Sequence, residues 1–171
     1  MLRLDRRALD QGPVEIGGSL APDDPLFAGL DFALAEAVRV TGTMAAAGPG
    51  RYFLQGDLIT RVRGVCRRCL APVDSAVAVR LGMLFTDDPL GDDPSAWVLD
   101  PQAALLDLSE AIREELILSV PEYVLCREDC RGLCPGCGED LNAGTCTCRP
   151  AADARWAPLE ALRRRLPDDP R

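Results

Sequence analysis

The chain has 171 residues, of which 47% are hydrophobic, and it carries a formal net charge of −8 with no histidine and no lysine. This length suits one domain, or one domain with a small metal-bound module, and the hydrophobic fraction argues against global disorder. The acidic balance disfavours non-specific nucleic-acid binding, and the usual general base and Schiff-base amine are missing. We therefore expect a folded protein that is not an enzyme and has no small-molecule substrate.

The N-terminal segment MLRLDRRAL lacks the sustained apolar run of a signal peptide, and no stretch approaches membrane-spanning length. These features predict a cytoplasmic protein without a membrane contact. In that compartment thiols stay reduced, so clustered cysteines hold metal more often than they form disulfides.

Residues 1–29 alternate short apolar pieces with Gly, Pro and Asp and predict only weak strands. From Phe32 to Met44 apolar residues recur at a period of two, with Glu36 as the exception. This pattern indicates a strand or a bent pair of strands. The segment AAAGPG, which ends at Gly50, is predicted to be a turn.

A short extended piece, Arg51–Leu54, is followed by a predicted turn at Gln55-Gly56 and by a strand over residues 57–65. The clearest strand of the chain comes next, over residues 73–85. Its alternate residues are apolar and predict one face that covers a core; they are Val73, Val77, Val79, Leu81, Met83 and Phe85. The segment CRRCLAP therefore lies at the connection between two antiparallel strands.

Residues 86–95, TDDPLGDDPS, contain two prolines and no EF-hand spacing, so we interpret them as a solvated acidic loop rather than a cation site. Asp107, followed three places later by Glu110, predicts a helix capping box. The helix it opens should end before Pro121 and should bury one stripe, made of Leu108, Ile112 and Leu116. Its acidic residues, Glu110, Glu114 and Glu115, are expected to form the solvent-facing side.

Eight cysteines provide the strongest signal of the chain. Thiolates at these spacings can converge on a tetrahedral ion, for which zinc is the commonest occupant. The segment Cys134-Pro-Gly-Cys137-Gly138 is typical of a zinc knuckle, in which the glycine lets a backbone N–H turn toward sulfur. The preferred partition has two tetrads: Cys134, Cys137, Cys146 and Cys148 in one, and Cys66, Cys69, Cys126 and Cys130 in the other.

Several alternatives to this metal assignment stay open. Pairs of cysteines could be exchanged between sites, or one site alone could bind, giving one zinc ion instead of two. An iron–sulfur cluster could replace zinc. A thiol oxidoreductase could use Cys66-Arg-Arg-Cys69, because neighbouring arginines lower a thiol pKa, but no thioredoxin-like βαβ pattern surrounds this motif. A metal-dependent hydrolase would need an open metal position, which a four-thiolate zinc shell lacks.

Four arginines around the first CxxC form a candidate contact patch for RNA or a protein partner: Arg61, Arg63, Arg67 and Arg68. Phosphate contacts would make RNA binding strongly dependent on salt. The alternative interpretation is a solvated strand face.

At the C-terminal end an apolar stripe predicts a short docked helix; it consists of Trp156, Leu159, Leu162 and Leu166. Together these elements predict an α+β fold, with a mostly antiparallel sheet, one central helix, a cysteine-rich zinc-binding module and a short C-terminal helix. We expect residues 1–121 to hold the sheet, the helix and the CxxC hairpin tip. Residues 122–171 should form the zinc module and the terminal helix, packed on the same domain.

In order along the chain, CRRCLAP, SEAIREELILSVP, LCREDCRGLCPGCGEDLNAGTCTC and ARWAPLEALRRRL resemble the YceD-like family, also called large ribosomal RNA subunit accumulation proteins. The resemblance spans about residues 51–166. The first CxxC matches a widespread feature of that family, whereas the dense downstream cysteines match only some members. The family offers no catalytic residues to transfer.

The resemblance implies a non-enzymatic factor in large-subunit ribosomal RNA processing or accumulation, and hence in ribosome biogenesis. Its expected partner is a basic ribosomal protein or an RNA-processing protein, since the acidic chain favours a protein contact. Direct RNA binding is the alternative.

Overall fold

The computed structural model describes residues 2–89, 93–148, 155, 159 and 162. It divides into two compact units. One contains the residues up to Cys66 together with Ala71–Cys126, and the other contains Arg67–Leu70 together with residues from Arg127 onward. The elements all belong to the first unit and are β1 (Arg3–Asp5), η1 (Arg6–Asp10), β2 (Val14–Leu20), η2 (Pro25–Phe27), β3 (Ala33–Leu34), β4 (Val38–Gly48), β5 (Arg51–Val65), β6 (Pro72–Thr86), β7 (Trp97–Val98), β8 (Leu105–Asp107) and α1 (Ser109–Ser119).

The main sheet of the first unit has the strand order β2-β4-β5-β6-β7, with β3 paired to β5 outside this path. All its neighbours are antiparallel except β6 and β7, which run parallel. Strands β1 and β8 form a separate antiparallel pair. The predicted mostly antiparallel sheet with one α-helix is therefore confirmed for the part of the chain that the structure describes. Trp156 and Leu166 of the expected terminal helix lie outside it, so that helix stays a prediction.

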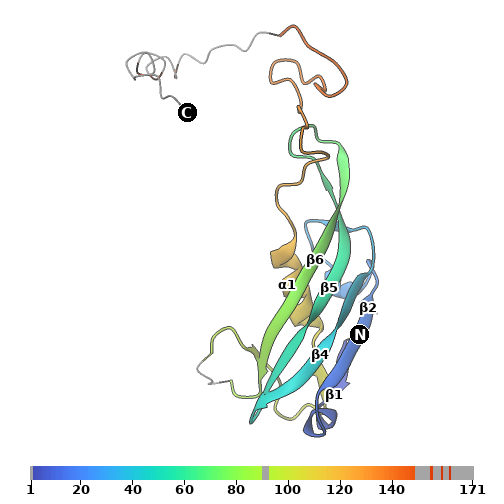
Figure 1. Cartoon of the computed structure of the whole chain (residues 1–171), viewed down its shortest axis with the longest axis vertical. Coiled ribbons are helices and arrows are strands. Elements are labelled where there is room, and N and C mark those ends of the chain that lie inside the picture. Colours follow the sequence, from blue (N-terminus) through green and yellow to red (C-terminus); the bar gives the residue numbers. More distant parts are fainter. Residues whose placement is uncertain (1, 90–92, 149–154, 156–158, 160–161, 163–171) are drawn as a thin grey trace. The chain divides into compact units, whose positions relative to one another are not determined.

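One face of the sheet and one face of α1 enclose the hydrophobic core (Figure 1). Strand β6 buries alternate side chains as predicted, and α1 buries its expected stripe of Leu108, Ile112 and Leu116. Because successive strand residues point to opposite faces, β4, β5 and β6 each contribute every second residue to this core. Its least exposed large side chains are Val38, Val40, Met44, Leu54, Leu58, Leu81, Phe85, Leu106, Leu108, Ile112 and Leu116.

The start of α1 differs from the predicted capping box. The N-cap residue is Leu108, which has no side-chain capping bond, so the helix begins one residue later than the box requires. The Asp107 carboxylate instead accepts the Ser109 N–H at 3.0 Å and the Arg3 guanidinium at 2.7 Å. The end of α1 at Ser119, ahead of Pro121, and the exposure of Glu110 and Glu114 agree with the sequence, whereas Glu115 is half-buried.

The predicted turn at Gln55-Gly56 is wrong, because β5 runs without interruption from Arg51 to Val65. Gly56 lies directly opposite Gly42 of β4. A Cβ atom at Gly56 would lie 2.7 Å from the Gly42 Cα, so glycine permits a close approach of two strands here rather than a change of direction. The turn predicted for AAAGPG is correspondingly shorter, since β4 continues to Gly48.

We expect Gly56→Ala to lower the free energy of unfolding by about 1–3 kcal/mol, because the new methyl group would overlap the backbone of β4. Gly64→Ala in the same strand is the matched control. Nothing lies within 4 Å of its added Cβ, so it should be neutral or stabilising by up to about 1 kcal/mol, the usual cost of a strand glycine. Urea unfolding of both variants measures the difference. Equal midpoints would contradict the close-approach explanation.

The acidic loop after β6 is less solvated than predicted at its first carboxylate. Asp87 pairs with Arg6, whose guanidinium also donates to the Tyr52 hydroxyl at 2.9 Å and to the Pro101 carbonyl at 2.9 Å. The hydrogen bond that Arg6 donates to the Asp87 carboxylate raises the Arg6 pKa above its ordinary value. The sequence did not indicate this pairing, because Arg6 and Asp87 are 81 residues apart along the chain.

Candidate metal centres

The first group of sulfur atoms consists of Cys66, Cys69, Cys126 and Cys130. Cys66 and Cys69 occupy the connection between β5 and β6. The last residue pair of these two strands before the connection is Val65 and Pro72. This tight loop is held by a bond from the Cys66 N–H to the Ala71 carbonyl at 2.8 Å. The four Sγ atoms all lie within 4.8 Å of one another. The structure therefore brings together the four cysteines that the preferred partition assigned to one tetrad.

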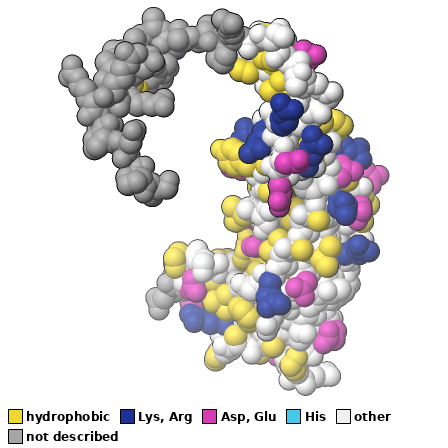
Figure 2. All heavy atoms as spheres, turned by 45° about the horizontal axis from the view of Figure 1, so that its top comes forward, with side chains coloured by type: hydrophobic (Ala, Val, Ile, Leu, Met, Phe, Trp, Pro, Cys, Tyr) yellow, Lys and Arg dark blue, Asp and Glu magenta, His cyan; other side chains and the backbone are white. Residues whose placement is uncertain are grey.

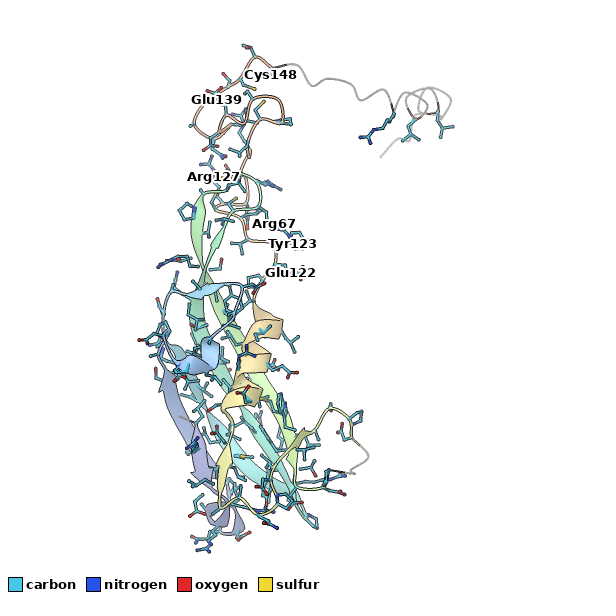
Figure 3. All side chains as sticks on the ribbon, turned by 180° about the vertical axis from the view of Figure 1, so that it is seen from behind. Arg67, Glu122, Tyr123, Arg127, Glu139 and Cys148 are labelled. Carbon is cyan, nitrogen blue, oxygen red and sulfur yellow. The ribbon has the colours of Figure 1, made fainter. Side chains whose placement is uncertain are left out.

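The second group lies within the second unit and consists of Cys134, Cys137, Cys146 and Cys148, again with all Sγ atoms within 4.8 Å of one another. The CPGC turn places the Gly136 N–H 3.3 Å from the Cys134 sulfur. Gly138 has a φ of 76° and donates its N–H to the Cys134 carbonyl at 2.8 Å. The glycine N–H that approaches the Cys134 sulfur is thus that of Gly136, within the turn that Gly138 follows. Figure 3 shows the Cys148 side chain on this loop.

Both tetrads suit a tetrahedral thiophilic ion. With Zn–S bonds of about 2.3 Å, the sulfurs of a tetrahedral shell lie about 3.8 Å apart. The sulfur–sulfur limit of 4.8 Å agrees with that spacing, and the Cys134 and Cys146 sulfurs are 3.1 Å apart, which is too long for a disulfide. None of the eight cysteines, all of which the structure describes, forms a disulfide. The donor set is entirely sulfur, which suits a structural zinc ion or an iron–sulfur cluster.

The charges of the second tetrad also favour a cation. Hydrogen bonds from Cys146 and from the Cys137 and Gly136 backbone lower the pKa of Cys134 to about 6. Its neighbour Cys148 hydrogen-bonds to Cys137 and Cys134, which raises the pKa of Cys148 to about 12. Four thiols at this separation cannot all ionise on their own, because each thiolate repels the next. A bound dication would remove that repulsion.

The four candidate arginines are all exposed, and three of them have defined contacts within the chain. Arg61 faces Glu36 at 3.4 Å, and Arg63 faces Asp74 at 3.3 Å. Arg68 belongs to the second unit and donates to the Cys130 carbonyl at 2.8 Å and to the Glu128 carbonyl at 3.3 Å. Arg61, Arg63 and Arg68 therefore each contact a carboxylate or a carbonyl of the chain. Arg67 is not without a partner either.

One residue near the sulfurs is not indicated by the cysteine spacing. Asn142 lies between Cys137 and Cys146 and donates its side-chain N–H to the Cys130 sulfur at 3.4 Å. An asparagine between cysteines of a candidate metal site could have suggested such a contact. Only the folded loop shows that it reaches a cysteine of the other tetrad.

Comparison with known proteins gives matches that agree with one another over most of the chain. The sequence profile described as "Large ribosomal RNA subunit accumulation protein YceD" matches residues 54–163, a range that contains all eight cysteines. An uncharacterized protein of Mycobacterium tuberculosis is 34% identical over 157 residues, which cover 86% of this chain and 68% of that protein. No solved structure gives a significant match.

Two plant relatives carry a functional name. The large ribosomal RNA subunit accumulation protein YCED homolog 1, chloroplastic, of Zea mays is 25% identical over 66% of this chain and 49% of that protein. Its namesake in Arabidopsis thaliana is 29% identical over 56% of this chain and 34% of that protein. Among the residues that the structure describes, no helix has the length and apolar character needed to cross a membrane.

Proposed function

This chain belongs to the family of the large ribosomal RNA subunit accumulation protein YceD, and we propose that it supports large-subunit ribosomal RNA accumulation as a zinc-stabilised, non-enzymatic factor. The observation that carries the proposal is the family match over residues 54–163, which includes both sulfur tetrads. The names of the plant relatives support the same role.

Zinc is the metal that the two tetrads favour. A closed shell of four thiolates is the common structural form of zinc, and the N–H donors of Gly136 and Asn142 would stabilise thiolate charge at Cys134 and Cys130. Such a shell has no open coordination position for water. The ion would hold the cysteine-rich segment in its fold and would activate no nucleophile, which supports a scaffold role over an enzyme.

A protein is the preferred partner. The net charge of −8 favours contact with a basic ribosomal protein or an RNA-processing protein, and weakens the general attraction to phosphate. Figure 2 shows arginines interspersed with acidic side chains on the visible face. Because Arg61, Arg63 and Arg68 already bind carboxylates or carbonyls of the chain, direct RNA binding ranks second.

Deletion of the gene from the organism that makes this protein should lower the ratio of large-subunit to small-subunit ribosomal RNA. Wild-type protein should restore the ratio, whereas the double variant Cys66→Ser/Cys69→Ser should not, because it removes two ligands of one tetrad. Quantitative analysis of total RNA measures the ratio. The control Thr145→Ala/Thr147→Ala alters two exposed side chains beside Cys146 and should restore it fully.

Each strain must contain equal amounts of the protein by immunoblot, since destabilised variants are lost to proteolysis. An unchanged ratio in the deletion strain would contradict the proposed role. Full rescue by the cysteine variant at normal abundance would instead show that ribosomal RNA accumulation does not depend on metal binding by the first tetrad.

A further inference from the structure

The two tetrads are joined by a short and rigid piece of backbone. Only residues 131–133 separate Cys130 of the first tetrad from Cys134 of the second. The Leu133 N–H donates to the Arg68 carbonyl at 3.0 Å, and the Gly132 carbonyl accepts the Leu141 N–H at 2.9 Å. A Cβ atom on Gly132 would lie 2.9 Å from the same Arg68 carbonyl oxygen. Hydrogen bonds and close packing therefore hold the linker on both sides. A displacement of Cys130 in the first tetrad would be transmitted through it to Cys134 in the second.

The Asn142 side chain bridges this linker and the loop of the second tetrad. Its oxygen accepts the Arg131 N–H at 2.7 Å and the Arg127 guanidinium at 2.9 Å. Its nitrogen donates to the Asp140 carboxylate at 2.6 Å and to the Cys130 sulfur at 3.4 Å. Both ends of one amide are thus used, and one of its four partners is a sulfur of the first tetrad.

These partners fix the orientation of the amide. Two N–H donors face the oxygen, and a carboxylate and a sulfur face the nitrogen, so a flipped amide would oppose donors to donors. Aspartate at position 142 would keep the shape and turn a carboxylate toward Asp140 and the Cys130 sulfur. The site therefore requires a donor on this side, and not merely a side chain of this size.

We propose that Asn142 couples the two tetrads, so that metal binding by the second raises the affinity of the first. The inference rests on the proposed binding of zinc at both. Asn142 lies in the loop that Cys137 and Cys146 would close around a metal ion, so binding there would hold its amide against the Cys130 sulfur. An N–H directed at a metal-bound thiolate disperses its charge and orients it. By linkage, metal in the first tetrad would strengthen binding in the second by the same factor.

The test is a zinc titration of the full chain against a chromophoric chelator. The variant Cys134→Ser/Cys137→Ser removes the second tetrad and reports the affinity of the first alone. We expect that affinity to be weaker than in the intact chain by about 10–100-fold, the usual effect of losing a residue that orients a metal ligand. Asn142→Ala alone should weaken the first tetrad by a similar factor, and Asn142→Asp by at least as much.

Combining Asn142→Ala with the two serine substitutions should cause little further loss at the first tetrad, because both changes remove the same contact. The control Glu139→Ala shortens an exposed side chain in the same loop, labelled in Figure 3, and should leave both affinities unchanged. Losses that multiply in the combined variant, or an unchanged first tetrad in Asn142→Ala, would overturn the coupling while leaving the zinc assignment intact. A wild-type chain that takes up no zinc would overturn both, and neither result depends on the ribosomal RNA measurement.

Discussion

Wild-type protein should contain two zinc ions per chain, and the double variant Cys134→Ser/Cys137→Ser should contain one. Each tetrad provides four sulfurs within bridging distance, and losing two of the four leaves too few thiolates to retain the ion. The effect should be large, because structural zinc in small peptides contributes on the order of 10–16 kcal/mol of apparent binding free energy. Elemental analysis of protein purified without added metal measures both values.

This variant should lose order only in the second unit. The hydrophobic core lies in the first unit and contains no residue of the second tetrad, so the unfolding transition of the sheet should persist. Thr145→Ala/Thr147→Ala, in the same loop, should retain two zinc ions. Iron with visible charge-transfer absorption in place of zinc would show that an iron–sulfur cluster occupies the tetrads and would contradict the zinc assignment.

Leu116→Ala should lower the free energy of unfolding by about 2–5 kcal/mol, because it leaves a cavity between α1 and the sheet. Leu116 is 0% exposed and lies in the hydrophobic core. Leu118→Ala is a closely matched control, since it makes the same substitution two residues later on the same helix. Leu118 is 74% exposed, so its loss should change stability by no more than about 0.5 kcal/mol.

Urea unfolding followed by the fluorescence or circular dichroism of the first unit measures both variants. The slope of the transition should remain unchanged, because neither change alters the surface exposed on unfolding by much. Similar midpoints for Leu116→Ala and Leu118→Ala would show that α1 is not held to the sheet by its buried stripe, against the packing described above.

The features that the sequence predicted well are those whose physical cause is local. Period-two alternation identified β6, because successive side chains of a strand point to opposite faces whatever the distant partners are. The stripe of Leu108, Ile112 and Leu116 identified the buried side of α1, because residues four apart lie on the same face of a helix. The position of the first CxxC at a hairpin tip could also be predicted, because the expected strands over residues 57–65 and 73–85 lie on either side of it.

Other features depend on residues far away along the chain. Gly56 resembled a turn residue until the structure placed Gly42 opposite it, where only a hydrogen atom fits. Asp87 resembled a solvated carboxylate, yet Arg6 from the N-terminal segment pairs with it. Local propensity carries no information about such contacts, because their energy comes from packing and charge across the fold.

Cysteine grouping shows the same division. The amino-acid sequence by itself determined that the chain offers sulfur and no imidazole to a metal, since eight cysteines occur with no histidine. Only the tertiary structure decided which four sulfurs lie together, and that the Asn142 amide reaches from the loop of one tetrad to Cys130 of the other. Chemical identity is a property of each residue, whereas proximity is set by the path of the whole backbone.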